Sequence, residues 1–292
     1  MVSGHLPAML ADARSGGYAV AAFNVVDALS MTAVMQAAAS EASPVIVQTS
    51  AIVARRNGPR PLAATFHAAA ALIDVRVALQ LDHCSDLDLI RDCMDAGWDG
   101  VLFDGSAREP SENIRLTQLI VDEAHRCGVA VEGELEAIRG MEAGVASSSG
   151  QPRSLEESLA FIESTGIDAF APFIGNVHGR TNVPVILDVE RTRLLAGMSR
   201  VPLVLHGGTG TGEDVIRSLT AAGIAKINIS TAIREAYLHA VRDYAATDVM
   251  GDDPVALFDR IERSISEVAS RHMRWVGSVG QRSTPVESEV RV

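Results

Sequence analysis

The strongest constraint on the fold of this chain is an alternation of short apolar runs with longer segments of helical spacing. Eight runs rich in β-branched or apolar residues end in polar residues, as strands do. They cover 19–25, 44–50, 75–83, 100–106, 129–136, 169–177, 201–208 and 225–231. Helix-start signals lie between them, such as Ser30 and the run from Ser154 to Glu157. Eight such units predict a closed (β/α)8 TIM barrel rather than an open sheet.

Two further helices are predicted after the eighth strand, over 231–246 and 254–276. The apolar residues of the second helix have helical spacing, which predicts that they share one face and form a packing seam. They are Phe258, Ile261, Ile265, Val268 and Trp275. With 292 residues and 47% hydrophobic content, the chain can bury one large core. We therefore expect one domain, in which 1–250 form the catalytic barrel and 251–292 a C-terminal helical extension with a polar tail.

Charge and cysteine usage exclude several classes of function. The formal net charge of −12 argues against a general nucleic-acid or membrane binder. The chain has no apolar run of membrane length, and its N-terminus lacks the flank and cleavage site of a signal peptide. Its three cysteines form no CxxC motif and are expected to be free thiols. We expect a cytoplasmic protein.

Polar residues gather at the ends of the predicted strands, where a barrel enzyme places its chemistry. These ends carry Asn24, Ser50, Asp82, His83, Asp104, Glu134, His178, His206 and Asn228. Three imidazoles at one barrel mouth predict a catalytic zinc site with an open fourth position. The other five histidines lie near the N-terminus or in predicted helices, and we expect them to be surface or packing residues.

The fifth predicted strand carries a row of carboxylates. Glu132, Glu134 and Glu136 alternate with other residues, so all three are predicted to point to one face. Helices cover the outer face of a barrel strand, which favours the lumen for these charges, and there they need partners or a metal. Lys226, the only lysine of the chain, is the expected partner of Glu132.

Glycine-rich segments after the last two strands indicate an anion site. HGGTGTGEDV ends the seventh strand and begins a helix, and NIST ends the eighth strand. Barrels often bind phosphate between these two loops, through backbone N–H groups and short hydroxyls.

The motifs at these positions resemble those of the class II, metal-dependent ketose-bisphosphate aldolase family, which includes fructose- and tagatose-bisphosphate aldolases. AFNV, PVIVQTS, VALQLDH, VLFDGS, VEGELE, IGNVHG, LVLHGGTG and KINIST occur in the family's order. The resemblance implies that His83, His178 and His206 bind zinc or another divalent ion, with Glu134 and Asp104 as further metal-site carboxylates. It also allows a monovalent cation.

The same resemblance implies roles for the remaining site residues. Asp82 would exchange the proton of the C4 hydroxyl, and Glu142, on a loop, would move a proton at the enediolate carbon. Asn24 and Ser50 match polar substrate contacts. The phosphate-binding positions correspond to Gly179, Gly207, Thr209, Asn228, Ser230 and Thr231.

The chain departs from the family pattern at two places. In the loop before and after Glu142, residues Glu136, Arg139 and Ala143 replace two glycines and an aspartate. The family's C-terminal Asp-Pro-Arg is here Asp253-Pro254-Val255, and Arg260 is the candidate to replace that arginine, which holds a distal phosphate.

We therefore expect an aldolase that cleaves or forms the C3–C4 bond of a ketose 1-phosphate or 1,6-bisphosphate, with dihydroxyacetone phosphate as the ketone half. Two alternatives stay open, a Schiff-base aldolase that uses Lys226 and a catalytically weak sugar-phosphate binder. The resemblance also implies a homodimer or homotetramer.

Overall fold

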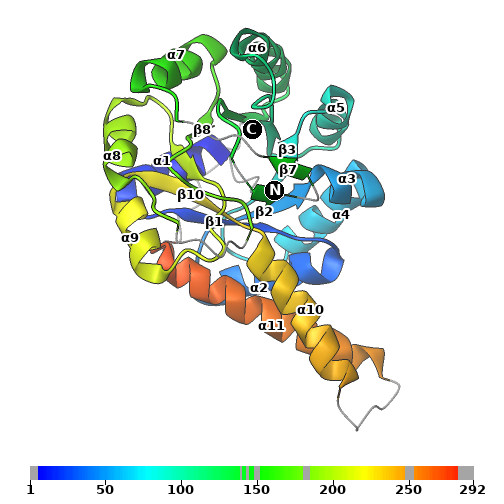
Figure 1. Cartoon of the computed structure of the whole chain (residues 1–292). Helices are drawn as coiled ribbons and strands as arrows, with labels where there is room; N and C mark the ends of the chain where they lie inside the picture. The colour runs from blue at the N-terminus through cyan, green and yellow to red at the C-terminus, as the bar shows by residue number, and fades with distance from the viewer. Residues whose placement is uncertain are drawn as a thin grey trace, which may run out of the picture.

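A closed barrel of parallel strands forms the centre of the computed structural model, which describes residues 6–138, 140–142, 145–147, 152–179, 185–246 and 253–281. The strand order is β1-β10-β9-β8-β5-β4-β3-β2, and Figure 1 shows the strands at the centre with helices around them. The strands are β1 (Val20–Asn24), β2 (Val45–Ser50), β3 (Val77–Cys84), β4 (Gly100–Phe103), β5 (Ala130–Glu134), β8 (Ala169–Ala171), β9 (Leu203–Leu205) and β10 (Ile224–Ile229). The predicted TIM barrel is confirmed, although most strands are shorter than the apolar runs.

Helices surround the barrel and connect successive strands. They are α2 (Ala28–Glu41), α3 (Ala51–Asn57), α4 (Pro59–Ala70), α5 (Leu87–Asp95), α6 (Pro110–Arg126), α7 (Leu155–Thr165), α8 (Val189–Met198), α9 (Glu213–Ala221) and α10 (Thr231–Ala245). Ser154 and Glu157 form the capping box that begins α7, as predicted. Helix α2 begins earlier than predicted because Asp27 is its N-cap and Ser30 completes the capping box.

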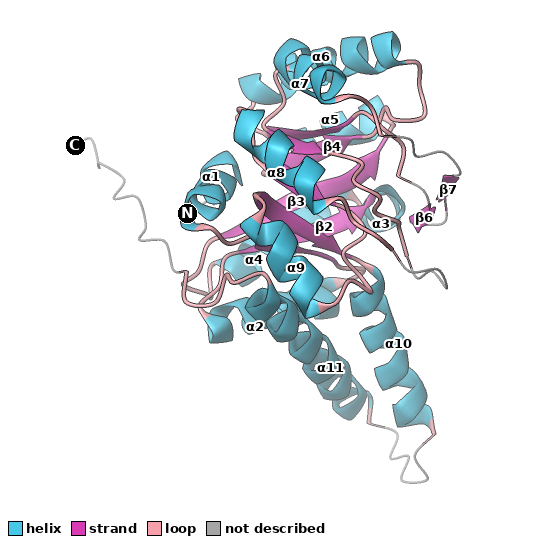
Figure 2. Ribbon diagram, turned by 60° about the vertical axis from the view of Figure 1, so that its left-hand side comes forward, coloured by secondary structure: helices cyan, strands magenta, loops and turns pink. Residues whose placement is uncertain are grey.

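An additional helix, α1 (Leu6–Gly16), closes the end of the barrel from which the strands start (Figure 2). Its buried residues Leu6, Met9 and Leu10 belong to an inner core with small strand residues such as Ala22 and Ala78. The sequence analysis did not predict α1. By filling the lower lumen with apolar side chains, α1 leaves the opposite end of the barrel for polar groups.

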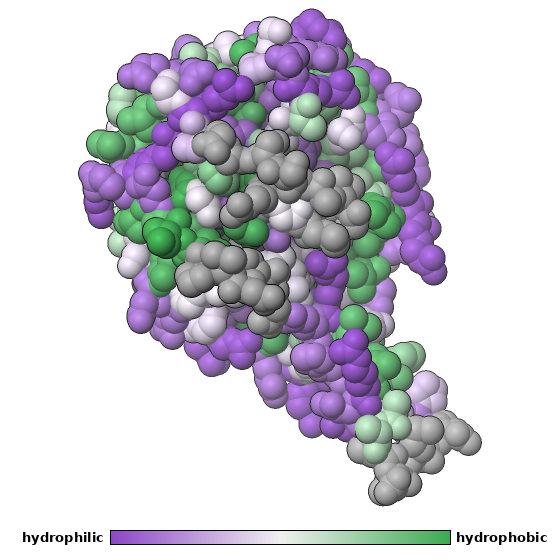
Figure 3. Space-filling view, in the orientation of Figure 1, coloured by the Kyte–Doolittle hydropathy of each residue, from purple (hydrophilic) through white to green (hydrophobic). Residues whose placement is uncertain are grey.

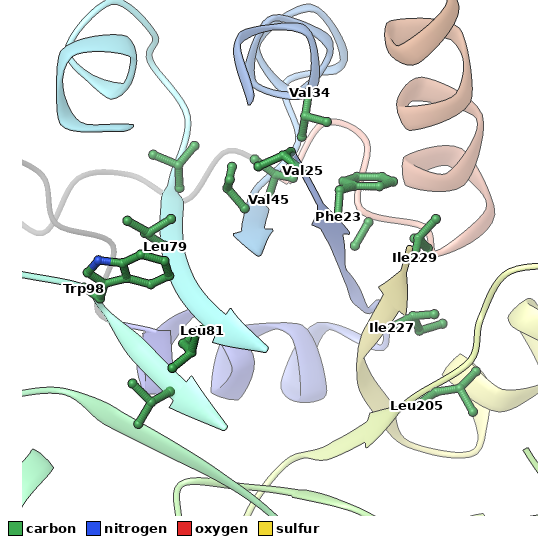
Figure 4. Close-up of a cluster of buried hydrophobic side chains, with 14 of the residues drawn as sticks. Phe23, Val25, Val34, Val45, Leu79, Leu81, Trp98, Leu205, Ile227 and Ile229 are labelled. Atoms are coloured by element: carbon green, nitrogen blue, oxygen red, sulfur yellow. The ribbon is translucent and has the colours of Figure 1, made fainter. Parts of the chain in front are cut away.

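The two faces of each strand carry different residues because side chains alternate along a strand. Figure 4 shows outward-facing residues, among them Phe23, Leu79 and Ile227, in the core between the strands and the helices. On the inner face the residues become polar along the strand direction. Buried Ala78, Gln80 and Asp82 follow one another on β3, and buried Ala130, Glu132 and Glu134 on β5.

Helix α11 (Pro254–Trp275) packs on α2 and α10, and the α10–α11 pair projects away from the barrel in Figures 1 and 2. The predicted seam is confirmed at Ile261 and Ile265, which are buried, but Phe258 is 48% exposed near the tip of the pair. Residues 282–292 of the predicted polar tail lie outside the described residues.

A small antiparallel hairpin of β6 (Gly140–Glu142) and β7 (Val145–Ser147) lies on the side of the barrel to which the strand arrows point (Figure 2). The outer helices present a largely hydrophilic surface around this side, with apolar patches beside the grey residues (Figure 3). Among the described helices, we find none that is both long enough and apolar enough to span a membrane.

Candidate active site at the barrel mouth

The barrel brings together the three histidines that were predicted to bind metal. His83 lies at the end of β3, His178 follows β8 and His206 follows β9. Their ring centroids are 4.6 to 5.9 Å apart. One ring nitrogen from each lies within 4.8 Å of the others, which is close enough for a shared ion. Residues far apart in the sequence therefore form one cluster of imidazoles.

His83 has features of a residue that is held for a ligand. Its backbone φ is 39°, in the left-handed region, which costs a residue other than glycine about 1–3 kcal/mol and is concentrated at functional sites. Its Nδ1 lies 2.9 Å from Oδ2 of Asp104, whose other oxygen accepts from the hydroxyl of Ser106 at 2.6 Å. Its Nε2 is buried without a hydrogen-bond partner. An imidazole oriented by a carboxylate on one nitrogen, with the other nitrogen unpaired, fits a metal ligand.

Two further carboxylates contact the ring nitrogens of His206. Oε2 of Glu134 lies 2.8 Å from Nδ1 of His206, and Oε1 of Glu132 lies 2.7 Å from Nε2. Glu134 also forms a second candidate metal cluster with His83 and Asp104. Glu134 and Asp104 are thus placed where the sequence analysis expected metal-site carboxylates.

Below the histidines, a buried ion pair supports the site. The ammonium of Lys226 contacts Oε2 of Glu132, and both side chains are inaccessible to solvent or nearly so. Gln80 donates to the same oxygen of Glu132 at 3.0 Å. The predicted pairing of Lys226 with Glu132 is confirmed. Because this carboxylate also contacts His206, the pair links the polar layer of the barrel to the metal-site residues.

The same contacts set the protonation of the cluster. Burial lowers the pKa of His83, but the carboxylates of Asp82, Asp104 and Glu134 outweigh burial and raise this pKa to about 10. Burial and the two neighbouring imidazoles lower the pKa of His178 to about 2. A metal binds neutral imidazole, so His178 is a ready donor at neutral pH, whereas His83 must release a proton when an ion binds.

Asp82 is fully buried beside the cluster and is held by amide groups. Asn24 donates to its Oδ2 at 2.7 Å, and Asn228 donates to its Oδ1 at 3.1 Å. Gln48 lies 3.5 Å from the same Oδ1. The Oδ1 atoms of Asn24 and Asn228 are buried without hydrogen-bond partners. A fixed carboxylate with two unused amide oxygens nearby is suited to accept a proton from a bound hydroxyl.

A pocket beside His178 contains the residues predicted to bind phosphate. Its lining is His178, Gly179, Gly207, Thr209, Asn228, Ser230, Thr231 and Arg234. Gly207 has a φ of 72°, and a β-carbon there would lie 2.3 Å from the carbonyl oxygen of Val177, so the close approach of the two loops requires glycine. The N-terminus of α10 begins at Thr231, and such a terminus offers N–H groups to an anion.

Sequence analysis missed Arg234, the cationic member of this pocket. Arg234 lies one helical turn after Ser230 on α10 and donates to Thr231 Oγ1 at 3.3 Å. The sequence did contain a signal for this residue. Arg234 follows Ser230 by four residues and Thr231 by three, and residues at these spacings share a helix face.

The remaining predicted residues fall in different places. Ser50 is half-buried at the N-cap of α3 and lines a cavity with Asn24. Glu142 ends β6, and its side chain lies outside what the structure describes. The expectation that Glu136 shares the lumen face was wrong, because β5 ends at Glu134. Glu136 is buried and accepts instead from the backbone N–H of Arg153 at 3.0 Å, with Arg191 at 3.7 Å.

Comparison with known proteins gives matches along almost the whole chain. The family model described as "Fructose-bisphosphate aldolase class-II" matches residues 5–281. A fructose-bisphosphate aldolase of Geobacillus stearothermophilus is 34% identical and aligns over 94% of this chain and 96% of its own length. A sulfofructosephosphate aldolase of Alkalicoccus urumqiensis is 30% identical over 90% of this chain and 96% of its own. A crystal structure of a putative fructose-1,6-bisphosphate aldolase from Coccidioides immitis has a TM-score of 0.89 and 27% identity, and covers 96% of this chain and 99% of that one.

Proposed function

This chain belongs to the class II fructose-bisphosphate aldolase family and is a carbon–carbon lyase, and we propose that its substrate is a ketose 1-phosphate or 1,6-bisphosphate. The bond that breaks or forms is C3–C4, and dihydroxyacetone phosphate is the ketone half. The observation that carries this proposal is the adjacency of three imidazoles, a buried carboxylate at Asp82 and a glycine-lined anion pocket.

Zinc, or another divalent ion, is the cofactor that these residues fit. Ring nitrogens of His83, His178 and His206 would hold it, with Glu134 and Asp104 as further donors, and three histidines with an open position are a common catalytic zinc set. When bound, a divalent cation supplies Lewis-acid stabilisation of the negative charge that cleavage leaves next to the C2 carbonyl. Glu132 orients the ring of His206 from the other side.

Asp82 acts on the proton of the C4 hydroxyl. In cleavage, the carboxylate accepts this proton as the C3–C4 bond breaks, and in condensation it returns the proton to the aldehyde oxygen. Asn24 and Asn228 hold both carboxylate oxygens in place. Their own unpaired amide oxygens accept hydrogen bonds from hydroxyl groups of the sugar.

The phosphate on C1 occupies the pocket next to His178. Gly179, Gly207 and Ser230 present backbone and hydroxyl donors, and Arg234 supplies the positive charge. This placement fixes the ketone half so that C2 and C3 lie beside the histidines. These local donors explain how a chain with a net charge of −12 can bind an anionic ligand.

Glu142 moves the proton at C3 after cleavage. The proposal rests on the match of Glu142 to the family's loop glutamate and on the position of β6 beyond the mouth (Figure 2). Loss of hydrogen exchange between dihydroxyacetone phosphate and solvent in Glu142→Ala, with zinc content unchanged, is the expected result. Unchanged exchange would assign this proton transfer to another group.

The Schiff-base alternative is disfavoured by the surroundings of Lys226. A Schiff-base lysine must reach a substrate carbonyl as a neutral amine. Lys226 has no exposed surface and its ammonium is paired with Glu132, which also contacts His206. Its position below the histidines therefore supports a structural role.

We also propose a cytoplasmic homodimer or homotetramer. The described cysteines, Cys84, Cys93 and Cys127, are free thiols, as expected in a reducing compartment. The projecting α10–α11 pair exposes Leu238, Val255 and Phe258, which a second copy would cover. Light scattering of the purified protein measures the number of chains in the assembly.

A substrate panel tests the proposed activity. Fructose and tagatose, each as the 1-phosphate and the 1,6-bisphosphate, are incubated with zinc-loaded protein, and release of dihydroxyacetone phosphate is measured. We expect turnover with at least one of the four. Binding of these compounds without measurable turnover of any would instead support the alternative of a sugar-phosphate binder without catalysis.

A further inference from the structure

A cavity between the ends of β1 and β2 opens beside the phosphate pocket. We call it the β1–β2 cavity, and its volume is about 240 Å³. It is lined by Asn24, Val25, Val26, Ser50, Ile52, Val53, Ser230 and Arg234. A second cavity of about 330 Å³ opens over β2 to β5, on the other side of Ile52.

The position of Asp82 decides which cavity receives the aldehyde half. Both oxygens of this carboxylate face amide groups from β1, β2 and β10, the closest being Asn24 at 2.7 Å and Asn228 at 3.1 Å. Asn24 lines the β1–β2 cavity, and Asn228 lines the phosphate pocket. A C4 hydroxyl at Asp82 therefore places the following carbons in the β1–β2 cavity rather than in the cavity over β2 to β5.

The described lining of the β1–β2 cavity contains a single charged side chain. This is Arg234, which also lines the phosphate pocket and is required there by the phosphate on C1. Two other arginines do not contribute to the described lining. Arg55 borders the other cavity and is paired with Asp86 at 2.6 Å, and Arg260, which sequence analysis considered for a distal phosphate, is exposed on α11.

Four aliphatic side chains form much of the remaining wall, namely Val25, Val26, Ile52 and Val53. A second phosphate against these groups would lose part of its hydration, and the described lining offers it no cation other than Arg234, which is unfavourable. A methyl or hydroxymethyl group would lose little on entering the same space.

We propose that the aldehyde half of the substrate is a short uncharged aldehyde, so that the sugar is a ketose 1-phosphate without a distal phosphate. This inference rests on the proposed aldolase function and narrows it to one substrate class. In condensation, C3 of dihydroxyacetone phosphate loses one proton and bonds to the aldehyde carbon, while the aldehyde oxygen gains one proton. The step needs no further reactant.

A matched series of three-carbon aldehydes tests the inference. Lactaldehyde, glyceraldehyde and glyceraldehyde 3-phosphate share the reacting carbon and its neighbouring hydroxyl, and differ at the terminal carbon. Each is condensed with dihydroxyacetone phosphate by zinc-loaded protein. We expect kcat/KM for glyceraldehyde 3-phosphate to be at least about tenfold below that of both uncharged aldehydes, since the described lining of the β1–β2 cavity offers the second phosphate no cation of its own.

Two variants test the assignment of the cavity. Ile52→Arg and Val53→Arg each add a cation to its wall, and Ile52 is 57% exposed, so the new side chain has room. Either variant should raise the kcat/KM of glyceraldehyde 3-phosphate relative to glyceraldehyde by about tenfold or more. The control Val215→Arg lies on the outer surface of α9 and should leave this ratio as in the wild type.

The possible failures separate the two proposals. A wild-type preference for glyceraldehyde 3-phosphate overturns the uncharged aldehyde and leaves the aldolase function standing. Ile52 also borders the cavity over β2 to β5, whereas Val53 lines only the β1–β2 cavity of these two, so a ratio unchanged in Val53→Arg overturns the assignment of the β1–β2 cavity. The absence of condensation with all three aldehydes, together with no hydrogen exchange of dihydroxyacetone phosphate, overturns both proposals.

Discussion

Glu132 places one carboxylate oxygen 2.7 Å from Nε2 of His206. The other oxygen contacts Lys226 and accepts from Gln80, so the carboxylate is held from two sides. This arrangement fixes the ring of His206 and leaves its Nδ1 facing Glu134 and the cluster of imidazoles. In many zinc sites a carboxylate contacts one ring nitrogen of a histidine whose other ring nitrogen binds the metal.

We expect Glu132→Gln to bind zinc more weakly, because a neutral amide replaces the carboxylate that contacts Nε2 of His206. Loss of a carboxylate that orients a metal-binding histidine lowers metal affinity about 10- to 100-fold. Competition with a chromophoric chelator measures this affinity. The variant Glu123→Gln, which removes a carboxylate paired with Arg91 between α5 and α6, serves as the control. Equal affinities in Glu132→Gln and the control would show that Glu132 does not support the metal site.

Removal of Lys226 should destabilise the protein strongly. Lys226→Met leaves the buried Glu132 without its cation, and breaking a buried pair in this way costs about 3–5 kcal/mol. The double variant with Glu132→Gln should recover part of the loss. Arg217→Met breaks an exposed pair with Glu213 and should cost no more than about 1 kcal/mol. Urea unfolding measures all four proteins. Similar losses in the two single variants would contradict the account of the buried pair.

Asp82→Ala is expected to separate catalysis from metal binding. Turnover should fall by about two to four orders of magnitude, the range for loss of a positioned acid or base, while zinc content stays at the wild-type level. Asp12→Ala, at the opposite end of the barrel, is a control for the loss of a carboxylate. Loss of zinc in Asp82→Ala without a separate catalytic defect would make Asp82 a structural residue.

Stability should depend on pH through His272, a packing histidine. Burial lowers its pKa, so the folded state holds the neutral ring more strongly than the unfolded state does. Its contribution to stability is therefore fully present above the unfolded pKa of about 6.5 and is lost progressively as pH falls below that value and through the lower folded pKa. His272→Phe keeps an aromatic ring against Phe23 and Trp275 and should lose less stability between pH 7.5 and about 5. The exposed His239→Phe should retain the wild-type slope. A His272→Phe slope as steep as the wild type would exclude His272 as the source.

Much of the site follows from sequence because barrel closure determines where strand ends meet. His83, His178 and His206 are far apart in the chain, yet each lies at or beyond the carboxyl end of a barrel strand, so barrel closure brings them together. The pairing of Lys226 with Glu132 was predictable for the same reason, since alternation directs both into the lumen.

Other features depend on where regular structure ends, which residue patterns define poorly. Glu136 continues the alternation of Glu132 and Glu134 in sequence, but β5 has already ended and the side chain contacts Arg153 and Arg191. Arg234 reaches the phosphate pocket only because α10 begins at Thr231. The role of α1 as a plug follows from tertiary packing, which no local pattern reveals.

Metal analysis and turnover, measured on the same protein before and after chelation, test the central claim most directly. The wild type should contain one divalent ion per chain, lose turnover when the ion is removed and regain it with zinc. The triple variant His83→Ala, His178→Ala, His206→Ala should contain no ion and show no turnover before or after addition of zinc. Full turnover after chelation, or in the triple variant, with a borohydride-trapped adduct on Lys226, would contradict a metal-dependent aldolase.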